Sequence, residues 1–296
     1  MNNLLLLVRR EFWEHRATFL VLPAVITIFL SLLLIAMFVS ASYYGPSGIN
    51  DEPSIRNSVA RLLEALRSHN EVDWSAAMQS GMQTAEAPFL FTLWLAVFMY
   101  LLGSLYGERK DRSLLFWKSL PVSDLATVLS KLLAALIFVP LVYFAGVVVV
   151  QLIALLSLTL ATSGTEVDAW RKIWAPSALP LVWLDFICRI LFQALWCLPL
   201  YGWLLLVSVL ARSAPLAWAL GIPLGLALVD IALIDLRLYA WFEAHLAVTK
   251  PEAYPYELRH YLADKLFTLD MLSALMVGSG LVALAIWQRR QAHEIW

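Results

Sequence analysis

Charge is scarce in this chain. Only 15% of its 296 residues are Asp, Glu, Lys or Arg, whereas 61% are hydrophobic. A soluble domain carries about 25% charged and about 45–50% apolar residues, so the composition excludes an ordinary soluble protein. The formal net charge of −1 provides neither a basic surface for nucleic acid nor an acidic tail.

Cysteine and nucleotide-binding motifs are equally sparse. Cys188 and Cys197 are the two cysteines, and a helix would hold them too far apart for a disulfide, so we expect both to pack as apolar residues. No Gly-x-x-x-x-Gly-Lys-Ser/Thr phosphate loop occurs, so we expect no ATP hydrolysis by this chain alone. Gly103 and Gly107 lack the Lys-Ser/Thr that such a loop needs, and are expected at a close helix contact. We expect no metal, no cofactor and no catalytic residue in this chain.

Long apolar runs dominate what is present. A helix needs about 20 apolar residues to cross the hydrocarbon core of a bilayer. Six segments meet this requirement: 18–42, 89–106, 130–161, 179–210, 215–235 and 269–288. The third and fourth are longer than needed and contain Pro140, Pro180 and Pro199, which favour kinked helices over additional spans. The fold class predicted is all-α, a single polytopic membrane domain over residues 1–296 with six transmembrane helices.

Lysine and arginine set the expected orientation. They are dense in the short segments 1–16, 107–123, 211–214 and 289–296, which places both termini in the cytoplasm. The apolar run after residue 16 is too long for a signal peptide and is expected to be retained. Residues 1–16 combine an apolar face with charges, which favours an interfacial helix over a simple cytoplasmic stub.

The other side carries three connections. Residues 43–88 form a long loop in which we expect an amphipathic helix that starts near Pro53 and Ser54. Residues 162–178 are shorter and charged. Residues 236–268 are rich in Tyr and Trp, which are typical of a membrane interface.

Polar residues inside apolar segments are the first candidate site. Asp185 and Arg189 lie four residues apart, one helical turn, and are expected to pair. With them we group the polar residues expected at the same outer level: Gln193, Asp230, Asp235 and Asp270. They predict an outer polar cluster or gate, or else local pairs that stabilise packing. The interior below is apolar, which fits an amphiphilic or bulky cargo and disfavours a proton relay.

A cytoplasmic segment is the second candidate. Glu108, Arg109 and Lys110 precede an apolar patch, and Leu-Pro-Val-Ser then begins the next helix, with Ser123 as its expected cap. The patch contains Leu114, Leu115, Phe116 and Trp117, and Leu120 and Pro121 of the following turn are expected to belong to the same docking surface. Such a patch is expected to meet either a protein partner or the lipid surface.

This segment resembles the cytoplasmic loop of type 2 ABC exporter permeases, through Glu108, Arg109, Leu115, the Leu120–Ser123 turn and Lys131. The N-terminal segment resembles the connecting helix of that family, through Arg9, Arg10, Glu11 and Phe12. The resemblance implies a permease subunit that pairs with a second copy, identical or not. It also implies docking on a separate ATP-binding subunit that holds ATP and Mg.

Three other functions compete with this interpretation. A scaffold subunit that anchors an ATPase would keep the docking loop but have no transport path. An intramembrane enzyme is disfavoured because Ser279 has no histidine within a span to act as its base. A secondary transporter is disfavoured because the chain shows no internal repeat.

Overall fold

The computed structural model describes residues 2–44, 62–66, 74–111, 122–230, 241, 244–245 and 265–291. All regular structure in these ranges is helical, which confirms the all-α prediction. Five described helical segments are long and apolar enough to cross a membrane: Ala17–Ala41, Ser75–Lys110, Asp124–Ala161, Trp170–Trp196 and Leu269–Gln291. The chain therefore has the architecture of a polytopic membrane protein.

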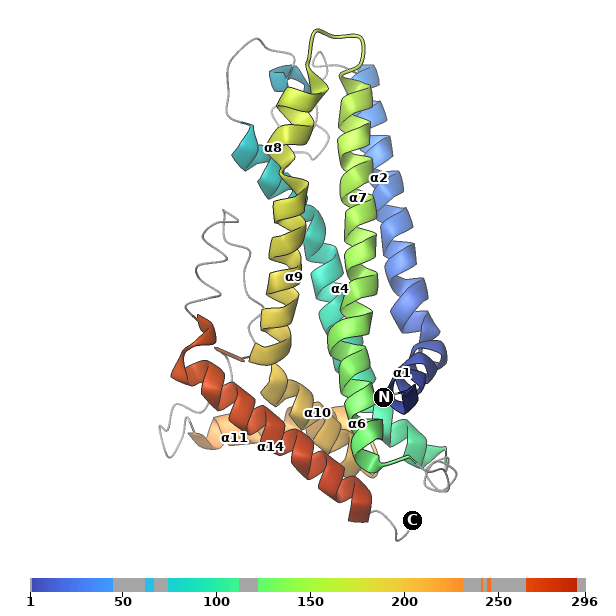
Figure 1. The fold of residues 1–296 in the computed structure, drawn as a ribbon, viewed down its shortest axis with the longest axis vertical. Coiled ribbons are helices and arrows are strands. Elements are labelled where there is room, and N and C mark those ends of the chain that lie inside the picture. Colours follow the sequence, from blue (N-terminus) through green and yellow to red (C-terminus); the bar gives the residue numbers. More distant parts are fainter. Residues whose placement is uncertain are drawn as a thin grey trace.

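Four helices run side by side along the long axis of the molecule (Figure 1). They are α2 (Leu22–Tyr44), α4 (Ser75–Lys110), α7 (Val139–Ala161) and α9 (Leu179–Trp196). The predicted interfacial segment is the helix α1 (Asn2–Glu14), which lies at one end of this bundle (Figure 1). At the same end α10 (Leu198–Leu210), α11 (Pro215–Val229) and α14 (Leu269–Gln291) lie across the bundle axis.

In the described ranges, three π-helical segments each end two residues before a proline. The π-helical segments are η1 (Ala17–Val21), η3 (Ala134–Phe138) and η4 (Trp170–Trp174), followed by Pro23, Pro140 and Pro176. Proline cannot donate to the carbonyl four residues back and its ring crowds that carbonyl, so a wider turn relieves the conflict. The short helices α6 (Asp124–Leu133) and α8 (Ala175–Ser177) adjoin η3 and η4. The predicted distortion near Pro140 therefore takes the form of a π-helical turn.

The long loop predicted at residues 43–88 is wrong at its C-terminal end, because residues 75–88 belong to α4. Gln79, Gln83 and Glu86 made this stretch resemble a loop, yet Gln79 donates to the Pro176 carbonyl of the short helix α8 at 3.3 Å, and Gln83 and Glu86 are buried. Residues 62–66 are helical and bury Leu63 and Leu66, as expected of an amphipathic helix. The expected helix start at Pro53 and Ser54 lies outside the described residues.

The fourth apolar segment is not one kinked helix, contrary to our expectation, because it turns at Cys197 between α9 and α10. The turn needs no polar side chains, because its backbone N–H and C=O groups form hydrogen bonds with the backbone of the adjoining helices. The Cys197 N–H donates to the Gln193 carbonyl at 2.9 Å, and the Cys197 carbonyl accepts from Tyr201 at 3.1 Å. Pro199 then occupies the first turn of α10, where its missing N–H costs nothing.

The fifth predicted span, 215–235, is described only as far as Asp230. Within it α11 has 15 residues, and α10 before it has 13. At 1.5 Å per residue these helices are about 20 Å long, less than the hydrocarbon thickness of about 30 Å. A count of six spans therefore stays a prediction.

Glycine allows α10 and α14 to pack closely. A Cβ on Gly278 would meet the Leu198 backbone at 2.7 Å, and one on Gly202 would meet the Gly278 carbonyl at 2.8 Å. The close contact expected at Gly103 and Gly107 is wrong, since a Cβ at either would meet no atom within 4 Å. Both cysteines are free, Cys197 buried and Cys188 half-buried, in agreement with their expected apolar role.

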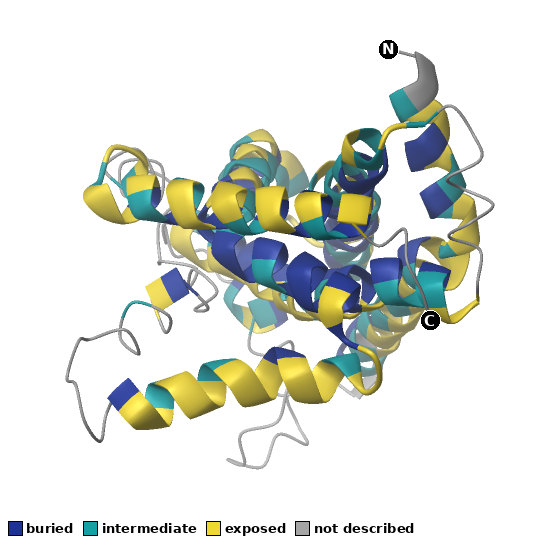
Figure 2. Cartoon of the chain, turned by 90° about the horizontal axis from the view of Figure 1, so that it is seen from below, coloured by how far each residue is buried: buried dark blue, intermediate teal, exposed yellow. Residues whose placement is uncertain are grey.

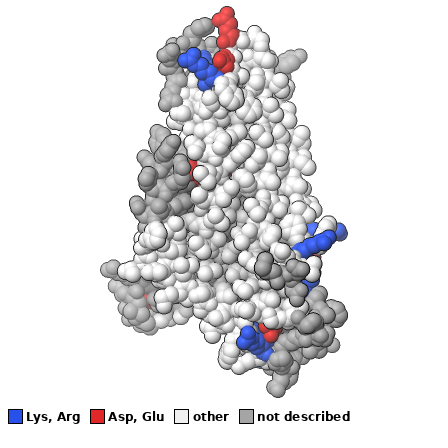
Figure 3. Space-filling model, in the orientation of Figure 1, with Lys and Arg blue, Asp and Glu red and all other residues white. Residues whose placement is uncertain are grey.

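Exposure follows the pattern of a membrane protein. Buried residues lie on the faces that the helices turn toward each other, and exposed residues lie on the outside (Figure 2). The exposed side chains along α2 and α11 include Phe29, Leu32, Trp218 and Leu224. On the face shown in Figure 3, charged side chains gather near the two ends and leave a broad, nearly uncharged band between them. Lipid is the medium that suits such a band.

Candidate functional site

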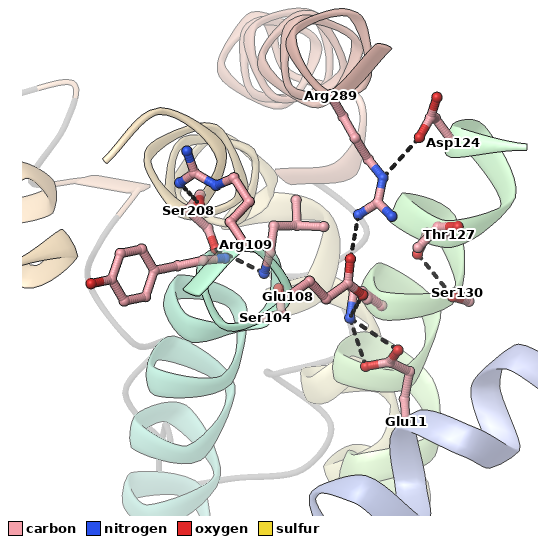
Figure 4. Close-up of polar contacts among 12 residues, drawn as sticks. Glu11, Ser104, Glu108, Arg109, Asp124, Thr127, Ser130, Ser208 and Arg289 are labelled. Carbon is pink, nitrogen blue, oxygen red and sulfur yellow. Dashed lines mark hydrogen bonds and ion pairs between the residues drawn. The ribbon is translucent and has the colours of Figure 1, made fainter. Parts of the chain in front are cut away.

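The end of the bundle that carries α1 contains a buried group of charged side chains, which we call the ionic network. Its members are Arg10 and Glu11 of α1, Glu108 of α4, Asp124 and Lys131 of α6, and Arg289 of α14. Glu108 and Asp124 stand on either side of residues 112–121, which are outside the described ranges. The ionic network therefore joins both ends of the predicted cytoplasmic loop to the first and last described helices (Figure 4).

Lys131 lies at the centre of the ionic network. Its Nζ donates to both carboxylate oxygens of Glu11, at 2.9 Å each, and lies 3.0 Å from Oε1 of Glu108. Glu11 also accepts the hydroxyl hydrogen of Tyr100 at 2.8 Å. Lys131 and Glu11 are each only 1% exposed, so these contacts replace nearly all of their hydration.

Glu108 connects the remaining helices. Its Oε2 accepts from Nη1 of Arg289 at 2.8 Å, while Oε1 lies 3.3 Å from Nη2 of Arg10. Arg289 in turn donates through Nε to Asp124 at 2.9 Å. One carboxylate thereby holds α1, α4, α6 and α14 together.

Among the described residues, the six members of the ionic network are three carboxylates and three cations, and the half-exposed Glu14 makes a longer contact of 3.5 Å with Arg10. Buried charges are tolerated only when they are paired and hydrogen-bonded. Removing one partner of a buried pair typically costs about 3–5 kcal/mol, because the other charge is left uncompensated. The four helices are therefore expected to move at this end as one unit.

Arg109 and Ser208 extend this unit to α10. Nη2 of Arg109 donates to the carbonyls of Ser208 and Ala211, at 2.8 and 2.7 Å. The Ser208 hydroxyl accepts from the backbone N–H groups of Leu105 and Tyr106 on α4. Arg109 thus caps the C-terminal carbonyls of α10, a role that its neighbour Lys110, which is exposed, does not share.

Several predicted coupling residues are found in these contacts. Glu108, Arg109, Arg10 and Glu11 all make short polar contacts at this end. Arg9 is exposed, and Phe12 is half-buried with its ring centroid 5.8 Å from that of Phe19. The predicted cap is confirmed, since the Ser123 hydroxyl accepts from the Ala126 N–H at 3.2 Å. The apolar patch (Leu114, Leu115, Phe116 and Trp117) lies outside the described residues, as do Leu120 and Pro121.

Sequence analysis missed three residues of this region. Tyr100, Asp124 and Arg289 come from three different helices and contact the network at 2.8–2.9 Å. A signal existed for Arg289, a charge on the last turn of an apolar helix, which we had used only for orientation. Nothing in the local sequence links it to Glu108, 181 residues away.

His15 adjoins the ionic network at the end of α1. Its ring centroid lies 4.9 Å from that of Tyr100 in an edge-to-face arrangement. Burial lowers the pKa of His15 below its usual 6.5, and the nearby carboxylates of Glu11 and Glu14 oppose that shift. The neutral imidazole is therefore favoured in the folded protein.

The predicted outer polar set does not gather in one place. Asp185 and Arg189 are buried in the middle of α9, and Gln193 donates to Cys197 Sγ at 2.7 Å where α9 ends. Asp230 is buried at the end of α11, whereas Asp270 is exposed on the first turn of α14. Asp235 lies outside the described residues.

The short ionic contact of Arg189 is with Glu86 of α4, at 3.1 Å, and not the expected one with Asp185. Gln151 of α7 donates to the Met82 carbonyl at 3.1 Å and to Glu86 at 3.4 Å, and accepts from the Trp183 indole at 2.8 Å. The buried side chains of Glu86, Gln151 and Arg189, from α4, α7 and α9, thus form one group, which we call the buried polar cluster. Glu86 was missed because its stretch was assigned to a loop.

Among the residues that the structure describes, no three His, Cys, Asp or Glu side chains are grouped to hold a metal ion. Comparisons with protein-family models, curated proteins and solved structures gave no match to this chain. Its function must therefore be argued from its own geometry.

Proposed function

We propose that this chain is the membrane permease subunit of an ATP-binding-cassette exporter, in a bacterial inner membrane, with both termini in the cytoplasm and six spans. It would work as a dimer of two permease copies, driven by a separate ATPase that docks on residues 107–123. The observation that carries the proposal is the ionic network, which ties both ends of this loop to α1 and α14.

Rigidity at this point is what a coupling site requires. A partner that pushes on residues 112–121 would act directly on the end of α4 and the start of α6. Lys131 and Glu108 would pass that movement to α1 through contacts of 2.9–3.0 Å. Since α1 leads through η1 into α2, the movement would reach the membrane-embedded part of the chain.

The work itself would come from the partner. A partner can shift a conformational equilibrium only by as much as its affinity differs between the two states. Nucleotide-dependent closure of two ATPase subunits would supply that difference. The permease contributes a docking surface and a stiff connection, which agrees with the absence of a phosphate loop in its sequence.

Cargo class follows from the apolar interior. Apart from the buried polar cluster, the described spans are packed with aliphatic and aromatic side chains such as Phe89, Tyr143 and Phe186. This environment suits an amphiphilic or bulky molecule better than a small ion.

The test begins with affinity purification of the tagged full-length chain from membranes of its own host in mild detergent. We expect a phosphate-loop ATPase to co-purify in stoichiometric amount, and the complex, not the chain alone, to hydrolyse Mg-ATP. Glu108→Gln should reduce ATP hydrolysis by the complex about tenfold, since a charge-assisted buried hydrogen bond contributes about 1.5–3 kcal/mol.

Glu166→Gln, an exposed carboxylate between α7 and η4, is the matched control and should leave activity unchanged. Monodisperse gel filtration establishes that both variants fold. ATP hydrolysis by the purified chain alone, or full activity in the Glu108 variant, would contradict the proposal. A complex that hydrolyses ATP but moves no amphiphile into or out of proteoliposomes would indicate the scaffold function instead.

A further inference from the structure

A pocket lies against the buried polar cluster, between α4, η3 and the start of α7, α9 and α10. Most of its lining is apolar, and residues from these four sides include Trp94, Pro140, Ile190 and Tyr201. Arg189 and Gln193 bring a guanidinium and an amide to the same lining. The cavity volume is about 50 Å³, so the pocket would take only a few atoms of a ligand, oriented by the few polar groups of its lining.

Some hydrogen-bond donors of Arg189 have no acceptor among the described residues. Its side chain is 2% exposed, and Nη1 donates to Glu86 at 3.1 Å. No group within the described ranges accepts from Nε or Nη2, which carry most of the guanidinium N–H groups. Buried donors without acceptors are costly, so a ligand that accepts from them gains affinity.

Charge around Arg189 decides what kind of acceptor fits. The Glu86 carboxylate already balances the guanidinium, and Asp185 lies close enough to act electrostatically on Glu86. An anionic ligand would add a negative charge to a buried site where the guanidinium already has its carboxylate. A cationic ligand would face the guanidinium itself. An uncharged acceptor, such as an ester or amide carbonyl, avoids both costs.

We propose that this pocket binds an apolar molecule through an uncharged carbonyl, ester or amide, which accepts hydrogen bonds from Nε and Nη2 of Arg189. The apolar body of the ligand would lie against Trp94, Ile190 and Tyr201. That this ligand is the transported cargo rests on the proposed function, whereas its binding does not.

Photolabelling tests the proposal on the full-length chain in nanodiscs. Three diazirine probes with the same long alkyl chain are compared: a methyl ester, the corresponding free carboxylate and the plain hydrocarbon. Labelled peptides are quantified by mass spectrometry. We expect the ester to label peptides around Trp94 and Ile190 about three- to tenfold more than either other probe, the range that one or two added hydrogen bonds supply.

The double variant Glu86→Gln/Arg189→Met removes both charges together, so that neither is left buried alone. It should lose the preference for the ester, while Leu195→Ala, an exposed change on the same helix, should keep it. Should the double variant fail to fold, the three-probe comparison on the unaltered chain still decides.

Equal labelling by the hydrocarbon would show an ordinary lipid-facing crevice and overturn the proposal. A preference for the carboxylate would also overturn it, as would an ester preference that survives in the double variant. The labelling experiment requires no ATPase. If the ester binds but no ATPase co-purifies with the chain, the transport function is refuted and the binding proposal stands.

Discussion

The Lys131→Met variant tests the ionic network most directly. Lys131 is the most buried cation of the ionic network, and its Nζ lies 2.9 Å from both oxygens of Glu11 and 3.0 Å from Glu108. Methionine retains most of the side-chain length and has no charge. The variant therefore leaves three carboxylates opposite only Arg10 and Arg289.

The expected magnitude follows from burial and from what remains. Breaking one side of a buried pair costs about 3–5 kcal/mol of unfolding free energy. Arg10 is 21% exposed and still contacts Glu11 at 2.7 Å, so we expect about 3 kcal/mol for Lys131→Met. The double variant Glu11→Gln/Lys131→Met removes an opposite pair and keeps an acceptor for Tyr100. It should be more stable than Lys131→Met by about 2 kcal/mol, because neighbouring substitutions are not additive.

Unfolding in mixed micelles with increasing SDS, followed by tryptophan fluorescence, measures these differences. Lys110→Met, at an exposed position on the last turn of α4, is the matched control and should change stability by less than about 0.5 kcal/mol. The reasoning is refuted if Lys131→Met unfolds at the same SDS fraction as Lys110→Met. It is equally refuted if the double variant is the less stable of the two Lys131 variants.

Two further predictions concern packing and pH. Gly278→Ala should lower unfolding free energy by about 1–3 kcal/mol, because its Cβ would meet the Leu198 backbone at 2.7 Å. Gly280→Ala, where a Cβ meets nothing within 4 Å, should not destabilise in the same SDS titration, and equal losses would contradict the packing. Burial lowers the pKa of His15 in the folded protein. The contribution of His15 to the unfolding free energy is therefore complete above about pH 6.5, the usual pKa of histidine, and is lost as the pH falls through that value toward the folded pKa. Acidification from about pH 7.5 to about pH 5.5 should therefore destabilise the natural chain more than His15→Phe, and parallel pH profiles would contradict this.

Hydrophobic content was sufficient to predict the helices, because a run of about 20 apolar residues has few other stable structures. Sequence could not predict their ends. The stretch 75–88 contains amides, a glutamate and Pro88, which together resemble a loop. It nevertheless continues α4, and its Gln79 and Glu86 side chains find partners on α7, α8 and α9. The turn at Cys197 was missed for the opposite reason, since its backbone groups are satisfied locally and require no polar side chains.

Pairing of charges shows the same limit. Helical spacing predicted that Arg189 would pair with Asp185, but spacing describes only one helix. Glu86 stands on α4 and reaches the guanidinium at 3.1 Å, a contact that depends on how α4 and α9 pack. Within the ionic network, Glu11 and Glu108 were anticipated through a family resemblance, whereas Arg289 and Asp124 required the tertiary structure.

The two groups of buried charge differ in a way that bears on what each can do. In the ionic network every carboxylate has a cation within 3.0 Å, and its six described members are three carboxylates and three cations. Such a group gains nothing from an added ligand and resists rearrangement, which suits a connection that must transmit movement. Around Arg189 the positive charge is balanced, but hydrogen-bond donors are left over beside an apolar pocket. A site of that kind is stabilised by a guest that brings acceptors without charge. Charged side chains are costly to bury in membrane helices. Where all their hydrogen bonds are made they stiffen the structure, and where donors are left without acceptors they can bind a ligand.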